Sequence, residues 1–408
     1  MNSIAIIGTF DTKGREFQYL KGKISEYGCK SYMIDCGVMG SADFEVDFAN
    51  SEVAKAAGST LQELIEMNDV SYALEKMALG AKNIVERLYR EGKIQGAVSM
   101  GGGQGTYLGM IAMSVLPIGV PKLMISTLAR AVKELFFCGA DTVVIDPIVD
   151  VSGLNSVLEY SIDCGASIIC SLVEESHMIS KSKRPVLAVT MFGTTTKCVD
   201  KVRENIEKAG YEVWVFHSNG VGGMNMEKLI RCGLIQGVLD LTTAEISQTY
   251  LGGTAATISS RLEAAGELGI PQVVSVGGVD LVNFLARDTV PERYQDGTRR
   301  FHMHNPTTTI MRSEARDYDA IGQIFAKKLN KAKGPVKMIF PMYGFSEYDK
   351  KDGVWYDPAA DMELLKALKK YLNSDISVIE SPYHINDAEF AKEAAQMMLN
   401  MLSESTVG

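Results

Sequence analysis

The chain begins with a short apolar run and an amphipathic stretch. Ile4–Ile7 form the run, and Gly8 and Thr9 follow it. Apolar residues then recur at spacings of three and four, which predicts a helix that ends at Gly28, and SYMID predicts a second strand. Buried strands that alternate with amphipathic helices are typical of a parallel sheet with helices on both faces.

The same plan returns in the second half of the chain. Val186–Thr190 predicts a strand, Gly193-Thr194 follows it, and an amphipathic stretch ends at Gly210. Four further pairs keep the same order: IQGAV and IQGVL, TYLGM and TYLGG, VPKLMIS and IPQVVSV, VDVSGLN and VDLVNFL. The sequence therefore predicts two Rossmann-like α/β domains with mostly parallel sheets, related by an internal repeat. We expect Ile94–Val98 and Ile235–Leu239 to form equivalent strands.

We place the domains at residues 1–180 and 185–408, separated by the short polar stretch SKSKRP. An acidic, helix-prone segment near residues 40–80 has no counterpart in the second copy, so we expect an insertion in the first domain. After Lys333 the pattern predicts a strand, a helix over Pro358–Tyr371, another strand and a final helix from Asp387.

The segment LGMIAMSVLPIGVPKLMIS is apolar enough to resemble a membrane span. Pro117, Gly119 and Pro121 interrupt it, so we interpret it as a buried helix, a turn and a buried strand.

The composition narrows the class of protein. A length of 408 residues fits two domains, and contents of 46% hydrophobic and 22% charged residues are typical of soluble globular proteins. The net charge of −9 argues against nucleic-acid or anionic-membrane partners. Seven cysteines without a CxxC pair indicate reduced thiols, and no signal peptide is evident at the N-terminus, so we expect a cytoplasmic protein.

Two glycine-containing loops, GTFDTK and GGGQGT, each join a predicted strand to a predicted helix in the first domain. Backbone N–H groups at helix N-termini bind phosphate, and glycines allow close approach. Asp11 or Asp35 would hold Mg²⁺ through water. The candidate nucleotide-binding residues are Gly8, Thr9, Asp11, Thr12, Lys13, Asp35, Gly101, Gly102, Gly103, Gln104, Gly105 and Thr106. The alternative is that the glycines serve tight turns and helix–sheet packing.

The second domain has LTTAEIS in place of GGGQGT, so its pocket is not expected to be a duplicate. Gly193, Thr194, Thr195 and Thr196 remain as a second candidate anion site. A polar region follows, from which we take Asp280, Arg299, His302 and His304 as candidate catalytic residues. His302 and His304 would share one face of a strand, which suits a metal. No third ligand is evident from the sequence, although Asp280 or Glu245 could supply one in space, and a polar strand face is the alternative.

Nine motifs carry a resemblance over nearly the whole chain. In order, they are GTFDTK, GGGQGT, STLA, DVSGLNS, MFGTTTKCV, LTTAE, VDLVNF, HNPTTTIMR and HINDAEFA. With them the chain resembles uncharacterised protein family 0261, which is similar to the N-terminal ATP-binding part of plant tobamovirus-resistance proteins. The resemblance implies two Rossmann-like domains, ATP bound with Mg²⁺ on the two glycine-containing loops, and a homodimer.

Three functions follow as hypotheses. In the first, ATP with Mg²⁺ binds the first domain and a small anionic metabolite binds the second, for phosphoryl or adenylyl transfer, or ligation, in the interdomain cleft. Lys13 would neutralise phosphates, and His302 or His304 would act as general base. In the second, the protein is a nucleotide-dependent binding or regulatory protein without turnover. A third hypothesis, an NAD-dependent oxidoreductase, lacks GxGxxG at the first βα turn, although Asp35 stands where a ribose-binding acid is expected.

Overall fold

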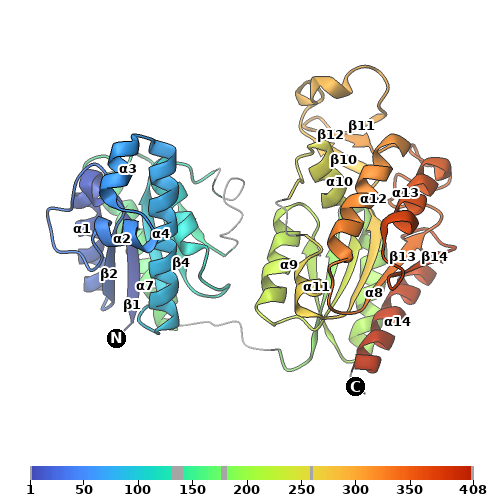
Figure 1. Ribbon diagram of the computed structural model, residues 1–408, viewed down its shortest axis with the longest axis horizontal. Helices are drawn as coiled ribbons and strands as arrows, with labels where there is room; N and C mark the ends of the chain where they lie inside the picture. The colour runs from blue at the N-terminus through green and yellow to red at the C-terminus, as the bar shows by residue number, and fades with distance from the viewer. Residues whose placement is uncertain (1, 131, 133–140, 176–181, 258–260, 406–408) are drawn as a thin grey trace. The chain divides into compact units, whose positions relative to one another are not determined.

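The computed structural model describes residues 2–130, 132, 141–175, 182–257 and 261–405. The chain divides into two compact units, Met1–Ser180 and Lys181–Gly408, which are described separately (Figure 1). Residues 176–181, which adjoin the expected domain boundary, lie outside the described part of the chain.

The first unit contains a five-stranded sheet in which every strand pair is parallel. The strand order is β2-β1-β3-β4-β5, and the strands are β1 (Ser3–Gly8), β2 (Lys30–Asp35), β3 (Gly96–Gly101), β4 (Lys122–Ser126) and β5 (Val143–Ile145). Two faces of the sheet are covered by helices. These are α1 (Phe10–Glu26) and α7 (Ser156–Glu175) on one face, and α2 (Asn50–Ala56), α4 (Val70–Arg90) and α5 (Gly103–Met113) on the other.

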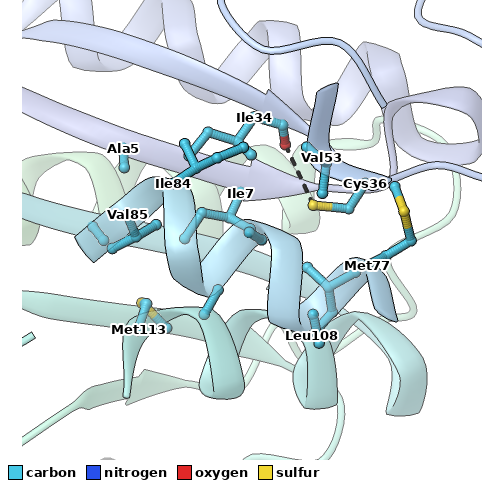
Figure 2. Packing of buried hydrophobic residues seen from close by; sticks show 14 of the residues in the cluster. Ala5, Ile7, Ile34, Cys36, Val53, Met77, Ile84, Val85, Leu108 and Met113 are labelled. Atoms are coloured by element: carbon cyan, nitrogen blue, oxygen red, sulfur yellow. Dashed lines mark hydrogen bonds between the residues drawn. The ribbon is translucent and has the colours of Figure 1, made fainter. Parts of the chain in front are cut away.

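The side chains of the strands alternate between two hydrophobic clusters. Ile4 and Ile6 pack with α1 and α7, whereas Ala5 and Ile7 pack with α4 and α5. Figure 2 shows the cluster that contains Ala5 and Ile7, with Ile7 close to Ile84 and Val85 of α4. This alternation is the period of two that the pleat of a strand imposes.

The segment near residues 40–80 forms α2, α3 (Leu61–Met67) and the first turns of α4. Thr60 caps α3 through the backbone N–H of Glu63, whose side chain binds back to Thr60. Asn68 ends α3 in the left-handed conformation, and Asp69 then caps α4. The chain therefore turns sharply between α3 and α4 at two adjacent polar residues.

The second unit contains a six-stranded parallel sheet in the order β14-β13-β9-β8-β6-β7. Its strands are β6 (Val186–Met191), β7 (Glu212–His217), β8 (Gly237–Thr242), β9 (Gln272–Gly277), β13 (Val336–Pro341) and β14 (Ser377–Ser381). The first four hold the positions that β1, β2, β3 and β4 hold in the first unit. The predicted equivalence of Ile94–Val98 and Ile235–Leu239 is therefore confirmed.

Helices cover both faces of the second sheet. They are α8 (Thr196–Lys208), α9 (Val221–Arg231), α10 (Ala244–Leu251), α11 (Ala264–Leu268), α12 (Ala315–Leu329), α13 (Pro358–Tyr371) and α14 (Ala388–Ser405), with 3₁₀ turns at Gly193–Thr195, Arg287–Thr289 and Glu292–Tyr294. The strand, helix, strand and helix predicted after Lys333 are confirmed as β13, α13, β14 and α14.

A three-stranded antiparallel sheet was not predicted. Its order is β10 (Leu281–Phe284), β12 (Thr308–Arg312) and β11 (Phe301–Asn305), and the chain passes through it between β9 and β13. A turn after Asn305, whose side chain accepts hydrogen bonds from Thr307, joins β11 to β12. This sheet carries both histidines of the HxH pair.

The apolar segment interrupted by Pro117 and Pro121 forms α5 and β4, as predicted. Within the described residues, one helix is long and apolar enough to cross a membrane by length and composition, namely α7. Its Leu158, Ile162 and Ile169 are buried against the first sheet, which is the environment of a core helix. Helix α7 is therefore weak evidence for a membrane span.

Candidate functional site

A cavity of about 640 Å³ lies at the carboxyl edge of the first sheet. The loops after β1, β2 and β3 and residues of α1 and α5 contribute to its lining, α3, α4 and the turn between them form another part, and Asp150 comes from the segment after β5. In the order β2-β1-β3-β4-β5 the chain reverses its direction across the sheet between β1 and β3. Ligands of open parallel sheets bind at such a point, outside the carboxyl ends of the strands.

Two glycines of the GGGQGT loop are not required by packing. A Cβ atom added at Gly102 would lie 3.6 Å from Oγ1 of Thr127, and one at Gly103 would lie 3.8 Å from Cδ1 of Leu128. Both distances are ordinary van der Waals contacts, and neither glycine has a positive φ. The protein itself therefore has room for a side chain at both positions, and that side chain would take up volume in the cavity that they line.

The other glycines of these loops are explained by packing. A Cβ atom at Gly8 would lie 2.1 Å from the Phe17 ring, and one at Gly101 would lie 3.0 Å from Cα of Gly105. At Gly105 it would lie 3.2 Å from the carbonyl oxygen of Met100. The packing explanation therefore holds for Gly8, Gly101 and Gly105.

Two helices begin at the cavity, and in neither does the N-cap side chain bind a backbone N–H group. Thr9 is the N-cap of α1, and its hydroxyl lies 3.1 Å from that of Thr12; the first N–H group of this helix, that of Phe10, donates to the Asp35 carboxylate. Gly102 is the N-cap of α5 and has no side chain to accept a bond. The first N–H groups of a helix have no acceptor within the helix, and its dipole is positive at this end. Both features favour an anion in the cavity.

Lys13 adds a positive charge to the lining. It interrupts the regular geometry of α1, with φ −130° and ψ 27°, and its ammonium group donates a hydrogen bond to the carbonyl oxygen of Val151. An ammonium group has three N–H donors, so this contact leaves two for a ligand.

Asp11 lies on the same lining with one oxygen engaged. Its Oδ2 accepts a hydrogen bond of 3.0 Å from the backbone N–H of Met39, whereas its Oδ1 is buried and has no partner among the described residues. A Cβ atom at Gly37 would lie 2.4 Å from Cγ of Asp11, so this glycine makes room for the carboxylate. The exposed Asp150 also lines the cavity, and the two carboxylates are oxygen donors of the kind that Mg²⁺ prefers.

Asp35 and Thr106, both predicted as ligand-binding residues, lie outside the lining, and so do Gly8 and Gly101. Asp35 is 1% exposed, and its carboxylate accepts bonds from the backbone N–H groups of Phe10, Gly37 and Ala42. Burial raises the pKa of Asp35. Thr106 is fully buried, and its hydroxyl lies 2.6 Å from that of Ser126. Both side chains hold the loops of the cavity in place.

The far wall of the cavity is apolar, and sequence reasoning missed it. Cys36, Met77 and Leu108 belong both to the hydrophobic cluster and to the lining, and Figure 2 shows them together at one end of that cluster. The insertion completes the wall with Leu64, Ile65, Val70, Ala73 and Leu74. The cavity therefore has a polar side at the two helix starts and an apolar side at α3 and α4.

The equivalent position in the second unit is occupied by side chains. Asp240 on β8 and Glu245 on α10 are buried, and both form ion pairs with Arg261, which is fully buried as well. Glu227 lies 3.6 Å from the same guanidinium. The expectation that the second pocket is no duplicate therefore has a physical reason: a buried ion network stands where the first unit has its glycine loop.

The predicted second anion site lies at the start of α8. Thr195 is buried, with its hydroxyl 2.8 Å from that of Thr242, and the carbonyl oxygen of Thr194 accepts a bond from the Asn386 side chain. The hydroxyl of Thr194 is buried without a partner among the described residues. Gly193 is exposed, and a Cβ atom there would meet nothing within 4 Å.

The four predicted catalytic residues of the second unit occupy different surroundings. His304 is exposed, with Nδ1 3.0 Å from the Tyr348 hydroxyl, and the His302 ring lies 5.2 Å from the Tyr348 ring. Arg299 makes a two-pronged ion pair with Asp317. Within the described residues, no group of three or more His, Cys, Asp or Glu side chains is arranged to hold a metal.

Asp280 lies in a buried charged cluster. Its Oδ2 accepts a bond of 2.6 Å from Ser346, and its Oδ1 has no partner among the described residues. Nearby, Arg312 pairs with Asp349 and Asp361. Burial, with a smaller contribution from Asp349, raises the pKa of Asp280 to about 7.

Fold and cavity together define a two-unit α/β protein with Rossmann-like parallel sheets and a cavity at the reversal point of the first sheet. Residues 2–178 match the N-terminal domain and residues 184–402 the C-terminal domain of the Uncharacterised protein family (UPF0261). The chain belongs to this family.

Similar proteins occur in bacteria and in a plant. A UPF0261 protein of Clostridium tetani is 39% identical over 98% of this chain and 99% of its own. The ToMV resistance protein Tm-1(GCR237) of Solanum lycopersicum is 34% identical over 98% of this chain and 56% of its own. This chain thus spans little more than half of the tomato protein. A UDP-N-acetylglucosamine 2-epimerase structure from Rickettsia bellii covers 99% of this chain and 96% of its own at 10% identity and a TM-score of 0.22, a likeness too weak to carry an argument.

Proposed function

We propose that the first unit binds ATP with Mg²⁺ in the cavity between β1 and β3. The observation that carries this proposal is the pair Gly102 and Gly103, which line the cavity at an uncapped helix start although packing leaves room for side chains there. Phosphate oxygens at this position explain the missing side chains, because they need both the N–H groups and the space.

The remaining lining supports the same ligand. Lys13 would neutralise phosphate charge, and Asp11 and Asp150 would hold Mg²⁺ directly or through water. The volume of about 640 Å³ is within the range of small-molecule sites, and the apolar wall suits the uncharged end of a nucleotide. The proposed chemistry is phosphoryl or adenylyl transfer to a small anionic metabolite, or its ligation, with the Gly193–Thr196 turn as the anion-binding element of the second unit.

Calorimetric titration of Gly103→Val with ATP and Mg²⁺ tests the site. The valine methyl groups would occupy the volume of phosphate oxygens, so we expect binding to weaken by at least about tenfold. Gly22→Val is the matched control, because Gly22 lies on the exposed side of α1 with nothing within 4 Å of an added Cβ atom. If Gly103→Val remains folded and binds ATP as the parent does, the proposed phosphate position is wrong.

A regulatory protein without turnover is the second candidate. Histidine and glutamate often act as general bases, and neither occurs among the described residues that line the cavity. The carboxylates of the lining belong to Asp11, Asp69 and Asp150. Measurement of ATP consumption with a panel of small carboxylic acids separates the two candidates: binding without consumption would favour the regulatory function.

A further inference from the structure

The apolar side of the cavity exposes large apolar side chains to solvent. The exposed fractions of three large apolar side chains at this side are 89% for Met39, 53% for Ile65 and 66% for Val70. They come from the loop after β2, from α3 and from the start of α4, and all line the same cavity. Apolar surface gathered around a cavity marks a place where something apolar binds.

One polar side chain stands among them with its hydrogen-bonding groups free. Asn68 lines the cavity between Ile65 and Val70, is exposed, and its amide has no hydrogen-bond partner among the described residues. Its backbone adopts φ 48° and ψ 33°, which places it at the turn between α3 and α4. An amide offers a donor and an acceptor side by side.

We propose that α3 and the start of α4 form the nucleobase subsite of this cavity, and that Asn68 is its specificity-determining residue. The inference rests on the proposed function, because phosphates at the starts of α1 and α5 place the other end of the nucleotide at the apolar wall. Met39, Ile65 and Val70 enclose the faces of the base. The amide of Asn68 pairs with the N6 amino group and N7 of adenine, a donor and an acceptor that match it.

The exposed apolar residues of α3 allow a matched test of the enclosure. Ile65 and Met67 lie on the same helix and are 53% and 55% exposed, but Ile65 lines this cavity, whereas Met67 lines a smaller hollow beside it. Ile65→Ser is expected to weaken ATP binding severalfold without changing the binding of inorganic tripolyphosphate. Met67→Ser is expected to change neither. If both substitutions weaken ATP binding equally, the proposed enclosure of the base by Ile65 is wrong.

Asn68→Gly tests the pairing without straining the turn, because glycine adopts the left-handed conformation at no steric cost. The probes are ATP, ITP, in which an acceptor oxygen replaces the N6 amino group, and tripolyphosphate, all with Mg²⁺. We expect the parent to prefer ATP over ITP by about tenfold and Asn68→Gly to lose this preference. Tripolyphosphate binding stays the same in both.

The outcomes separate this inference from the proposed function. A parent that binds ATP no more tightly than tripolyphosphate has phosphate binding but no base subsite, which overturns the inference alone. A parent that prefers ATP over ITP, with the preference kept in Asn68→Gly, has its base read elsewhere, which also overturns it. A parent that binds neither ATP nor tripolyphosphate contradicts the proposed function itself.

Discussion

Single residues in this protein separate into those that line the cavity and those that hold its loops, although their types are the same. Asp35 ends a strand of the first sheet, and Asp11 lies at the start of the helix that follows one. The carboxylate of Asp35 accepts hydrogen bonds from three backbone N–H groups, whereas one oxygen of Asp11 has no partner among the described residues. The sequence alone predicts that Asp11 or Asp35 holds Mg²⁺ and that both are nucleotide-binding residues. The different hydrogen bonding of the two carboxylates depends on which backbone N–H groups the folded loops bring to each, and the residue type does not indicate this.

Asp280 leads to a prediction about pH at the same scale. Its pKa is raised to about 7 by burial, so between pH 4 and 7 the folded protein keeps a proton that the unfolded chain releases. The free energy of unfolding therefore falls as the pH rises through this window, and the loss ends above the folded pKa. Asp280→Asn keeps a neutral group of similar shape, so its free energy of unfolding should fall less between pH 5 and 7.5.

Urea unfolding of the parent and of Asp280→Asn at both pH values measures this difference. The neighbours that share the buried cluster are Arg312, Asp349, Asp361 and Tyr318, and they remain in both proteins. Parallel pH profiles for the two proteins would contradict a protonated Asp280 in the folded state.

At the scale of elements, the repeated strand–helix pattern was readable from the sequence. Long periodic segments such as α8 and α13 were predicted close to their bounds, because their apolar faces repeat over several turns. The antiparallel sheet was missed since its strands have four or five residues and β11 is largely exposed. The apolar wall was missed because the packing of α3 and the first turns of α4 around the cavity is a tertiary contact that the local pattern of these helices does not indicate.

The buried ion network at the β8–α10 connection leads to a prediction about stability. Arg261 compensates the buried carboxylates of Asp240, Glu245 and Glu227. Arg261→Leu leaves the first two without this counter-ion, and among the described residues Glu227 keeps only Arg231 at 4.0 Å. We expect a loss of about 3–5 kcal/mol in the free energy of unfolding of the second unit. The loss should be smaller at pH 5 than at pH 8, because protonation relieves the carboxylates in the variant.

Arg203→Leu is the matched control for the Arg261 variant. Arg203 pairs with Asp200 on the surface of α8, with exposed side-chain fractions of 47% and 55%, and such pairs contribute about 1 kcal/mol or less. Chemical unfolding of both variants at the two pH values provides the comparison. Similar losses for Arg203→Leu and Arg261→Leu would mean that the buried network is not what stabilises this connection.

At the scale of the whole molecule, each sheet has a hydrophobic core on both faces, built from its own unit. The two clusters of the first sheet use residues between Ile4 and Val173, and those of the second use residues between Leu187 and Leu402. Residues 1–180 and 181–408, produced separately, should therefore each fold and melt cooperatively.

ATP with Mg²⁺ should stabilise the first half alone, by about 2.7 kcal/mol at a hundred times its Kd, which corresponds to about 5 °C or more in Tm. Thermal unfolding of the separate halves, with and without ATP, checks both statements. A first half that melts cooperatively but is not shifted by a nucleotide that shifts the full chain would show that residues after 180 complete the site.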